Sequence, residues 1–297
     1  MKNVLSIHST VTVGFVGNNV VGPVLTAMRL SPLLVPTVML AAHPGYGRRV
    51  GDAVPDHIVA DILSGLDEMI DMGRITAVMS GYLGTAGQTR AIAGFVDSWR
   101  RAGTGYYILD PVLGDRGRLY LPEDVARAMV ATLLPRADII TPNSFELGYL
   151  AAMPVSDRPT AAAAARHLMN THPLQAVIAT GISAGPDDGI NDGPDDGING
   201  GPDDGINDGP DGVGDLLVTR AGDEIWCHAG PDGRNVAGGG DLLTAILTGQ
   251  LADGAAVDTA FRIASRTAQD IIAASDSPRD LALLENLDRV AALTTRI

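Results

Sequence analysis

Short runs of apolar and β-branched residues alternate along the chain with longer, alanine-rich amphipathic stretches. The short runs are typical of buried strands, and the longer stretches are typical of helices. Because strands that alternate with helices form βαβ units, the pattern predicts an α/β fold with a mainly parallel sheet covered by helices on both faces. The predicted strands are residues 3–8, 31–40, 77–80, 106–110, 139–141, 176–180, 216–219 and 224–227. The predicted helices are residues 17–28, 55–72, 85–101, 122–134, 144–152, 160–171, 241–251, 257–275 and 281–293.

The composition narrows the class of protein. The 297 residues are enough for one large α/β domain whose core is stable without disulfides. Hydrophobic residues make up 45% of the chain and aromatic residues only 4%, so the core is built from Ala, Val, Leu and Ile. The formal net charge of −14 argues against nucleic acid as a partner, because phosphate backbones are bound by clustered Lys and Arg.

Two residue types occur only once. Lys2 is the only lysine, so the chain has no Gly-Lys-Ser/Thr phosphate loop and no lysine inside the fold for a Schiff base. Any use of a nucleotide must depend on backbone amides, arginine and metal ions. Cys227 is the only cysteine, which excludes a disulfide framework and a cysteine zinc site. The first seven residues are too short for a signal peptide and no apolar run has the length of a membrane span, so we expect a soluble cytoplasmic protein without a membrane partner.

An acidic repeat interrupts the α/β pattern at residues 185–212. Its unit is the octad Gly-Pro-Asp-Asp-Gly-Ile-Asn-Asp, and the segment holds nine of the 35 acidic residues. One isoleucine per octad buries too little apolar surface to offset the entropy of ordering, so we expect an expanded, disordered loop inserted in a single domain that spans 1–297. Calcium binding is the alternative, although the spacing matches neither an EF-hand loop nor the nonapeptide of parallel β-helices.

A glycine run near the end of the chain leads directly into a helix-forming segment. Gly238, Gly239 and Gly240 are followed by Asp241 and then by apolar residues. Glycines let backbone N–H groups converge, and the N-terminus of a helix attracts an anion, so the run can bind a phosphate. Asp241 at the edge of such a site can accept a proton from an attacking hydroxyl. A flexible loop with Asp241 as an N-cap explains this segment alone equally well.

Polar residues also follow several predicted strands, where ligands bind in parallel sheets. Ser9 follows the first strand, and Ser80-Gly81-Tyr82 follows the third, with a tyrosine that either stacks on a flat ring or packs in the core. Asp110 precedes Pro111, and the rigid proline backbone can hold the Asp110 carboxylate in position for a metal ion. Glu146 lies in the first turn of a helix that Asn143 or Ser144 can cap, so it is either part of the cap or a second oxygen ligand for Mg²⁺.

Taken together and in this order, these motifs resemble the ribokinase-like superfamily and, within it, the pyridoxal kinases. The resemblance covers nearly the whole chain outside the repeat. It implies a three-layer α/β/α sandwich with a mainly parallel central sheet. The motifs that carry it are Ile7-His8-Ser9 with Gly14-Phe15-Val16-Gly17-Asn18, Thr37-Val38-Met39-Leu40 with His43 and Tyr46-Gly47, Ser80-Gly81-Tyr82-Leu83-Gly84, Asp110-Pro111-Val112-Leu113-Gly114-Asp115, Thr141-Pro142-Asn143 with Glu146, and Gly238-Gly239-Gly240-Asp241.

The resemblance implies transfer of the γ-phosphate of ATP to the 5′-hydroxyl of pyridoxal, pyridoxine or pyridoxamine in vitamin B6 salvage. It implies Mg²⁺, with K⁺ as a further candidate ion, and a homodimer. Asp241 would be the base, and Gly238, Gly239 and Gly240 would form the anion hole. The substrate ring would be held by Ser9, Thr37, Tyr82 and His43. The ATP side would be formed by Asp110, Thr141, Asn143, Glu146, Thr180 and Thr219, of which Asp110 and Glu146 would organise the metal ion.

Three departures from the family pattern bear on this interpretation. Gly239 stands where relatives usually have Thr or Val, which loosens the loop, and Val13 and Phe15 replace aromatic or histidine positions. The repeat enlarges the segment after Thr180. A hydroxymethylpyrimidine kinase, which shares the later motifs, and a catalytically weak family member that binds pyridoxal 5′-phosphate are the alternatives.

Overall fold

The computed structural model of the protein describes residues 1–102, 104–185, 212–229 and 236–294. Almost all of the acidic repeat, residues 186–211, therefore lies outside the described residues, and its predicted disorder and calcium binding stay untested. Within the described residues, no helix is both long enough and apolar enough to cross a bilayer.

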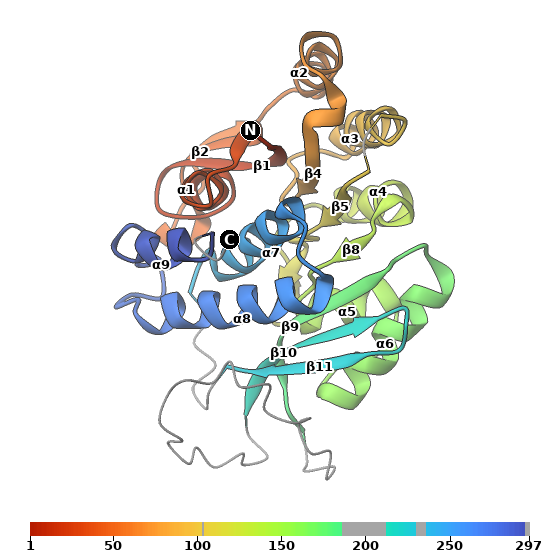
Figure 1. Ribbon diagram of the computed structural model, residues 1–297, viewed down its shortest axis with the longest axis vertical. Coiled ribbons are helices and arrows are strands. Elements are labelled where there is room, and N and C mark those ends of the chain that lie inside the picture. The colour runs from red at the N-terminus through yellow and green to blue at the C-terminus, as the bar shows by residue number, and fades with distance from the viewer. Residues whose placement is uncertain (103, 186–211, 230–235, 295–297) are drawn as a thin grey trace.

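A sheet of nine strands forms the centre of the molecule (Figure 1). The strands from β9 across to β2 run parallel to one another, whereas β10, β11 and β3 are antiparallel to their neighbours. A separate hairpin joins β6 (Gly114–Asp115) to β7 (Arg118–Leu119). From one edge to the other the sheet consists of β11 (Glu224–His228), β10 (Val213–Thr219), β9 (Ala176–Ser183), β8 (Ile139–Ile140), β5 (Tyr106–Leu109), β4 (Ile75–Ser80), β1 (Asn3–Val13), β2 (Ser31–Ala42) and β3 (Gly51–Ala53).

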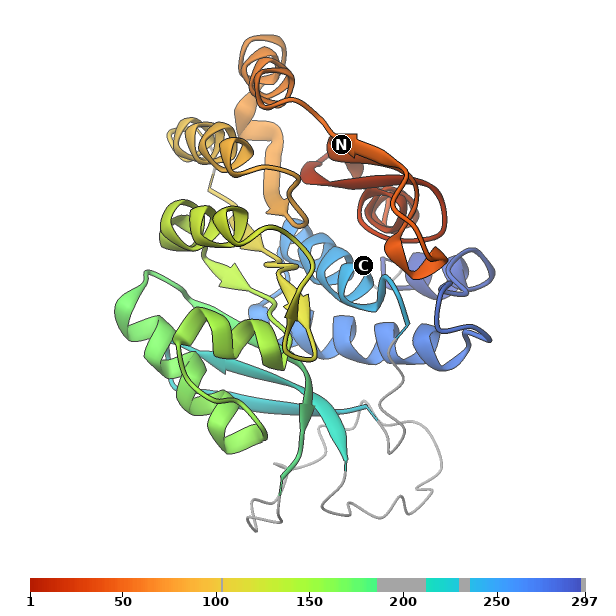
Figure 2. The same cartoon turned by 180° about the vertical axis from the view of Figure 1, so that it is seen from behind.

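Helices cover both faces of this sheet, which confirms the predicted three-layer α/β/α arrangement (Figures 1 and 2). One layer contains α1 (Asn18–Ala27), α7 (Gly239–Asp253), α8 (Val257–Ala273) and α9 (Leu287–Ala292). The other layer contains α2 (Asp56–Met69), α3 (Ala86–Trp99), α4 (Glu123–Thr132), α5 (Ser144–Ala151) and α6 (Arg158–Thr171). Short 3₁₀ turns are formed by Pro44–Tyr46, Met72–Arg74, Leu134–Arg136 and Leu284–Asn286.

Each face of the sheet has its own apolar core. Trp99 and Tyr107 are fully buried beneath the α2–α6 layer, and Phe261 and Leu25 are fully buried beneath the α1, α7, α8 and α9 layer. The helix α7 is buried around almost its whole circumference, because it packs on the middle strands on one side and on α1 and α8 on the others. A helix that is apolar on all sides is held in place by its neighbours, so its N-terminus is fixed relative to the sheet.

Most predicted elements are present, but three differ in a way that concerns the site. The strand β1 continues to Val13, beyond the predicted end at His8, with an irregularity in its pairing to β2 between His8 and Thr10. Such an irregularity redirects the side chains beside it, here that of Ser9. The last predicted helix, 281–293, is wrong over its first part, because α9 begins only at Leu287. The strand predicted at 216–219 begins at Val213 and runs antiparallel to β9.

Candidate active site

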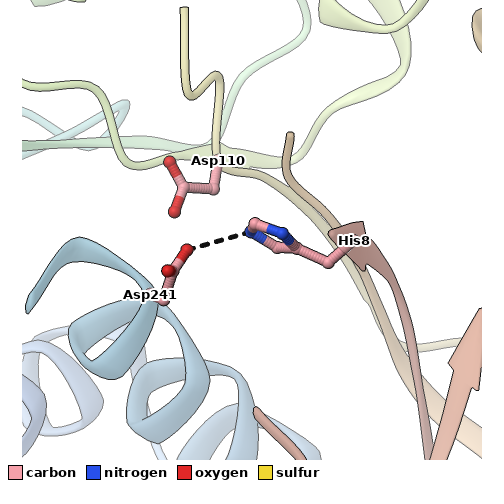
Figure 3. A group of neighbouring side chains, drawn as sticks. All are labelled: His8, Asp110 and Asp241. Carbon is pink, nitrogen blue, oxygen red and sulfur yellow. Dashed lines mark ion pairs between the residues drawn. The ribbon is translucent and has the colours of Figure 1, made fainter. Parts of the chain in front are cut away.

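The N-terminus of α7 meets the carboxyl end of the central strands, and this places Asp241 beside two other titratable side chains. The side chain of Asp241 faces His8 on β1, with Asp241 Oδ1 3.0 Å from His8 Nε2, while Asp110 approaches from the end of β5 (Figure 3). The other oxygen, Oδ2, accepts a hydrogen bond of 2.7 Å from the backbone N–H of Gly17. One ligand atom from each of His8, Asp110 and Asp241 lies within 4.8 Å of the other two. The sequence motifs at residues 8, 110 and 241 are thus parts of one buried site.

Hydroxyl groups connect Asp110 to the neighbouring strand. Thr244, one turn after Asp241 on α7, donates a hydrogen bond of 3.2 Å to Asp110 Oδ2. The hydroxyl of Thr141, which directly follows β8, lies 2.9 Å from that of Thr244. Across the described residues, no hydrogen bond reaches the second carboxylate oxygen of Asp110. One side of this carboxylate is therefore left for a ligand.

The two aspartates differ in their protonation. Burial raises the pKa of Asp110 well above its usual range, and the negative charges of Asp241 and Glu146 raise it further. Burial also acts to raise the pKa of Asp241, but the nearby His8, the Gly17 N–H and His43 outweigh it, so that the pKa of Asp241 is lowered. Asp241 is consequently the carboxylate that is ionised at neutral pH and can accept a proton, whereas at Asp110 the same His8 is too weak to offset burial and like charge.

The three glycines at the start of α7 have different structural roles. Gly238 is the N-cap, with a left-handed φ of +89°, and a methyl group there would overlap the backbone oxygen of Phe15. Gly239 is buried, and a methyl group there would come within 2.9 Å of Ile272 Cδ1. Gly240 is exposed, and a methyl group there would meet no atom within 4 Å. The space in front of the helix N-terminus is therefore open at Gly240, next to the carboxylate of Asp241.

Asn143 and Glu146 form a capping box at the start of α5. Asn143 Oδ1 accepts from the N–H of Glu146, while Glu146 Oε2 accepts from the N–H of Asn143. Glu146 Oε1 also accepts from the N–H groups of Leu113 and Gly114, at 2.8 and 3.2 Å. Burial raises the pKa of Glu146 to about 7, although these three N–H donors lower it. Both oxygens are occupied by the protein, so Glu146 supports the site by holding the 113–114 turn and by its charge near Asp110.

Three residues expected to hold the substrate ring make contacts within the site, Ser9 with His8 and Thr37 with Tyr82. Ser9 is buried, with its hydroxyl 3.2 Å from His8 Nδ1. Thr37 on β2 donates its hydroxyl to the backbone oxygen of Tyr82 at 2.6 Å. The hydroxyl of Tyr82 accepts from Arg49 at 3.2 Å. Thr37 thus fixes the turn that carries Tyr82, and the Ser9 hydroxyl lies at the Nδ1 edge of His8, whereas the Nε2 edge faces Asp241.

His43 lies at the end of β2, where backbone groups use both of its ring nitrogens. Nδ1 accepts from the N–H of Gly45 at 3.2 Å, and Nε2 lies 2.9 Å from the carbonyl oxygen of Arg279. The neighbouring Tyr46 donates its hydroxyl to the carboxylate of Asp280. His43 therefore joins the turn after β2 to the 279–280 segment, and it would touch a substrate only through its carbon atoms.

The antiparallel course of β10 corrects one predicted site residue. Thr180 lies near the carboxyl end of β9 and forms a bridge with Asn143, as expected for the nucleotide side. Thr219, however, pairs with Ala176, the first residue of β9, so it lies at the opposite edge of the sheet. Its hydroxyl donates to Asp223 in the turn that follows. The ATP-side role that the resemblance implied for Thr219 is wrong, because β10 runs antiparallel to β9 and carries Thr219 to the other edge.

Three parts of the site were not assigned a role from the sequence: the side chains of His8 and Thr244 and the backbone N–H of Gly17. Each looks ordinary in sequence, since histidine in a strand and threonine in a helix are most often packed core residues. Only the convergence of β1, α1 and α7 places them against Asp241 and Asp110.

Comparison with known proteins shows the family of the chain. The sequence profile described as phosphomethylpyrimidine kinase matches residues 24–281. The chain belongs to the phosphomethylpyrimidine kinase family. The matched range includes the strand ends that carry Asp110 and Thr141 and the N-terminus of α7 that carries Asp241.

Proteins similar to this chain carry the names of vitamin B6 kinases. The chain is 34% identical over 266 residues to the pyridoxine/pyridoxal/pyridoxamine kinase of Bordetella avium, a match that covers 89% of this chain and 82% of that one. It is 28% identical over 277 residues to a pyridoxal kinase of Actinobacillus succinogenes, covering 92% and 88%.

Solved structures show the same ribokinase-like fold. The pyridoxal kinase of Entamoeba histolytica aligns with a TM-score of 0.83 at 24% identity, covering 98% of this chain and 96% of that one. The pyridoxal kinase of Leishmania donovani in complex with ADP and pyridoxine aligns with a TM-score of 0.80 at 27% identity, covering 97% and 94%. The protein is therefore a kinase of the pyridoxal and hydroxymethylpyrimidine kinase group.

Proposed function

We propose that this protein transfers the γ-phosphate of ATP to the 5′-hydroxyl of pyridoxal and related B6 vitamers, forming pyridoxal 5′-phosphate. The observation that carries the proposal is the ionised Asp241 at the N-terminus of α7, next to the open backbone at Gly240. A phosphate bound at this N-terminus and a hydroxyl bound beside Asp241 would be adjacent. The complex of the Leishmania donovani kinase with ADP and pyridoxine supports the same pair of ligand classes.

In the proposed reaction, Asp241 acts as the general base. Its carboxylate takes the proton of the substrate hydroxyl while that oxygen forms a bond to the γ-phosphorus of ATP. The bond between the γ-phosphorus and the β,γ-bridging oxygen breaks, and ADP leaves with its electron pair. Backbone N–H groups at the start of α7 and the helix dipole stabilise the negative charge on the transferring phosphoryl group.

The chemistry of the donor set fits a magnesium ion on the nucleotide side. Asp110 is buried, has one carboxylate oxygen without a hydrogen bond from any described residue, and keeps a raised pKa because burial and the charges of Asp241 and Glu146 outweigh the nearby His8. Asp110 would hold the ion or its water molecules. The negative charge of Glu146 would attract the ion without contacting it. When bound, Mg²⁺ neutralises charge on the phosphates of ATP.

The pH dependence of magnesium use tests this assignment. Because the pKa values of Asp110 and Glu146 are raised, that of Glu146 to about 7, protons compete with the cation as the pH falls. The Mg²⁺ concentration that gives half the maximal rate is therefore expected to rise by roughly an order of magnitude between pH 8 and pH 6. Asp110→Asn should raise this concentration at pH 8 and flatten its pH dependence. A half-saturating concentration that is independent of pH in the unmodified protein would contradict the role of these carboxyl groups.

The hydrogen bond from Thr37 to Tyr82 gives a test of the substrate side. Thr37→Val keeps the shape of the side chain and removes the donor to the Tyr82 carbonyl. We expect KM for pyridoxal to rise about 3- to 10-fold, with kcat and KM for ATP nearly unchanged, because one hydrogen bond contributes about 1 kcal/mol. Steady-state kinetics with each substrate varied in turn measure this. An increase confined to KM for ATP would place Thr37 on the wrong side of the site.

A panel of hydroxymethyl heterocycles decides between the two substrate classes. Phosphorylation is measured with pyridoxal, pyridoxine, pyridoxamine and hydroxymethylpyrimidine, each with ATP and Mg²⁺. We expect the highest kcat/KM with a B6 vitamer. Turnover of the pyrimidine alone would replace our proposal with a hydroxymethylpyrimidine kinase, which the family description also fits.

A further inference from the structure

The imidazole of His8 is a titratable group that faces the catalytic carboxylate and has no part in the proposed reaction. The side chain of His8 lies on β1 and is only 1% exposed. Buried histidines need partners for both ring nitrogens, because an unpaired buried N–H destabilises the folded protein. The partners of His8 therefore define what it does.

One ring nitrogen is assigned by the backbone. The N–H of Ser9 donates to His8 Nδ1 at 2.8 Å, so Nδ1 presents a lone pair and the proton of the neutral ring resides at Nε2. Burial acts to lower the pKa of His8, but the charges of Asp241 and Asp110 outweigh it and raise the pKa. A second proton would add to Nδ1. In both states Nε2 carries a hydrogen and faces Asp241.

The contact at Nε2 is close but not linear. Nε2 lies 3.0 Å from Asp241 Oδ1, yet no described acceptor lies along its N–H direction with hydrogen-bond geometry. The interaction is thus an approach of the positive N–H edge of the ring to a carboxylate in a largely buried site, where the electrostatic attraction is stronger than in water. The second oxygen of the same carboxylate is held by the N–H of Gly17.

Two glycines fix the position of the ring. A methyl group on Gly81 would overlap His8 Nε2, and a methyl group on Gly17 would come within 2.7 Å of His8 Nδ1. Gly17 also has a left-handed φ of +54°, so the backbone there is shaped to pass the ring closely. The imidazole is therefore clamped between the turn before α1 and the turn after β4, and its Nε2 edge is presented to Asp241 from a fixed direction.

We propose that His8 is the positioning residue of Asp241, whose carboxylate it holds aimed at the substrate hydroxyl through its Nε2–H edge. The proposal rests on the function proposed above and extends it to the control of the base. The contact of Nδ1 with the Ser9 hydroxyl at 3.2 Å also connects the base to the ring-binding side of the site. His8 and Gly17 together restrain both oxygens of Asp241, because His8 Nε2 lies against Oδ1 and the Gly17 N–H donates to Oδ2.

A pair of substitutions of equal length tests the role of the N–H donor. His8→Gln retains an N–H group that can reach Asp241, whereas His8→Met has nearly the same length and volume without a donor. We expect His8→Met to lower kcat about 10- to 100-fold with KM for ATP and for pyridoxal within about 3-fold. We expect His8→Gln to stay within about 5-fold of the unmodified kcat. Equal loss in both variants with unchanged melting temperature would overturn the proposal, and so would an unaffected His8→Met.

Nuclear magnetic resonance of the unmodified protein gives a second test that needs no activity. Correlations between the ring nitrogens and carbon-bound protons report which nitrogen of His8 is protonated. We expect Nε2 to carry a proton throughout pH 6 to 8, and its signal to move in Asp241→Asn. An Nε2 without a proton would refute the proposed contact. If the protein phosphorylates none of the heterocycles while Nε2 behaves as expected, the proposed function fails and the pairing of His8 with Asp241 stands.

Discussion

Asp241→Asn is expected to lower kcat by about 10²- to 10⁴-fold, the range that a general base contributes. The asparagine side chain has almost the same shape, and its oxygen can still accept from the Gly17 N–H, as Asp241 Oδ2 does now. An amide cannot accept the proton of the substrate hydroxyl at neutral pH. The affinity for ADP should change by less than about 3-fold, because the nucleotide contacts remain. Single-turnover phosphorylation of pyridoxal and calorimetric titration with ADP measure the two quantities.

Asp138→Asn is the matched control for the removal of a buried acid. Asp138 is as buried as Asp241, but it lies at the opposite edge of the sheet, where Arg100 pairs with it at 2.7 Å. We expect this variant to lose about 1–3 kcal/mol of stability with kcat nearly unchanged. If Asp241→Asn kept kcat within 10-fold while folding normally, Asp241 would not be the base, and the site would need another proton acceptor.

Gly238→Ala is expected to have the largest effect on stability among the glycines at the start of α7. Its φ of +89° disfavours any side chain, and the new methyl group would overlap the backbone oxygen of Phe15, which cannot move aside as a side chain can. We expect a loss of about 3 kcal/mol and a fall in melting temperature of roughly 5–10 °C. Because Phe15 precedes Gly17, the shift also disturbs the N–H that holds Asp241, so activity should fall even in the folded fraction.

Substitutions at two other glycines, Gly240 in the first turn of α7 and Gly254 just after its end, separate the causes of the stability loss in Gly238→Ala. Gly254, at the other end of the helix, has a φ of +102°, and a methyl group there would meet no atom within 4 Å, so Gly254→Ala should cost only about 1 kcal/mol and leave kcat unchanged. Gly240→Ala should keep the melting temperature within about 2 °C, because its methyl group meets no atom. Side chains in helices lean toward the N-terminus, so this methyl group would enter the proposed phosphate site and lower kcat about tenfold. A fully active Gly240→Ala would move the phosphate site elsewhere.

The structure also revises the interpretation of Gly239. The sequence suggested that a glycine at this position loosens the anion-binding loop. Gly239 lies inside the first turn of α7, is buried, and faces Ile272 on α8. Tight packing of this turn limits the freedom that the missing side chain would otherwise give, because the conformation is set by the neighbouring helix.

Some features of the site were predictable because they depend on the order of residues along the chain. The alternation of strands and helices, the carboxyl-end positions of Asp110 and Thr141, and the start of α7 at the glycine run all follow from local periodicity and from the geometry of parallel strands, whereas Ser9 lies inside β1 rather than after it. Thr219 was misplaced for a related reason. Hydrophobic runs do not reveal strand direction, and the hydrogen bonds that make β10 antiparallel to β9 form between segments far apart in sequence.

The fold class, the family and the residue types for phosphoryl transfer could be predicted from the chain alone, because periodicity and motif spacing are local properties. Which carboxylate is ionised depends on how the elements pack. Asp110 and Asp241 are both aspartates beside strand or helix ends, yet burial and like charge raise the pKa of one, while the nearby His8 and Gly17 lower that of the other. Their pKa values depend on distances of a few ångströms between β1, β5, α1 and α7, which exist only once the sheet and α7 have packed together.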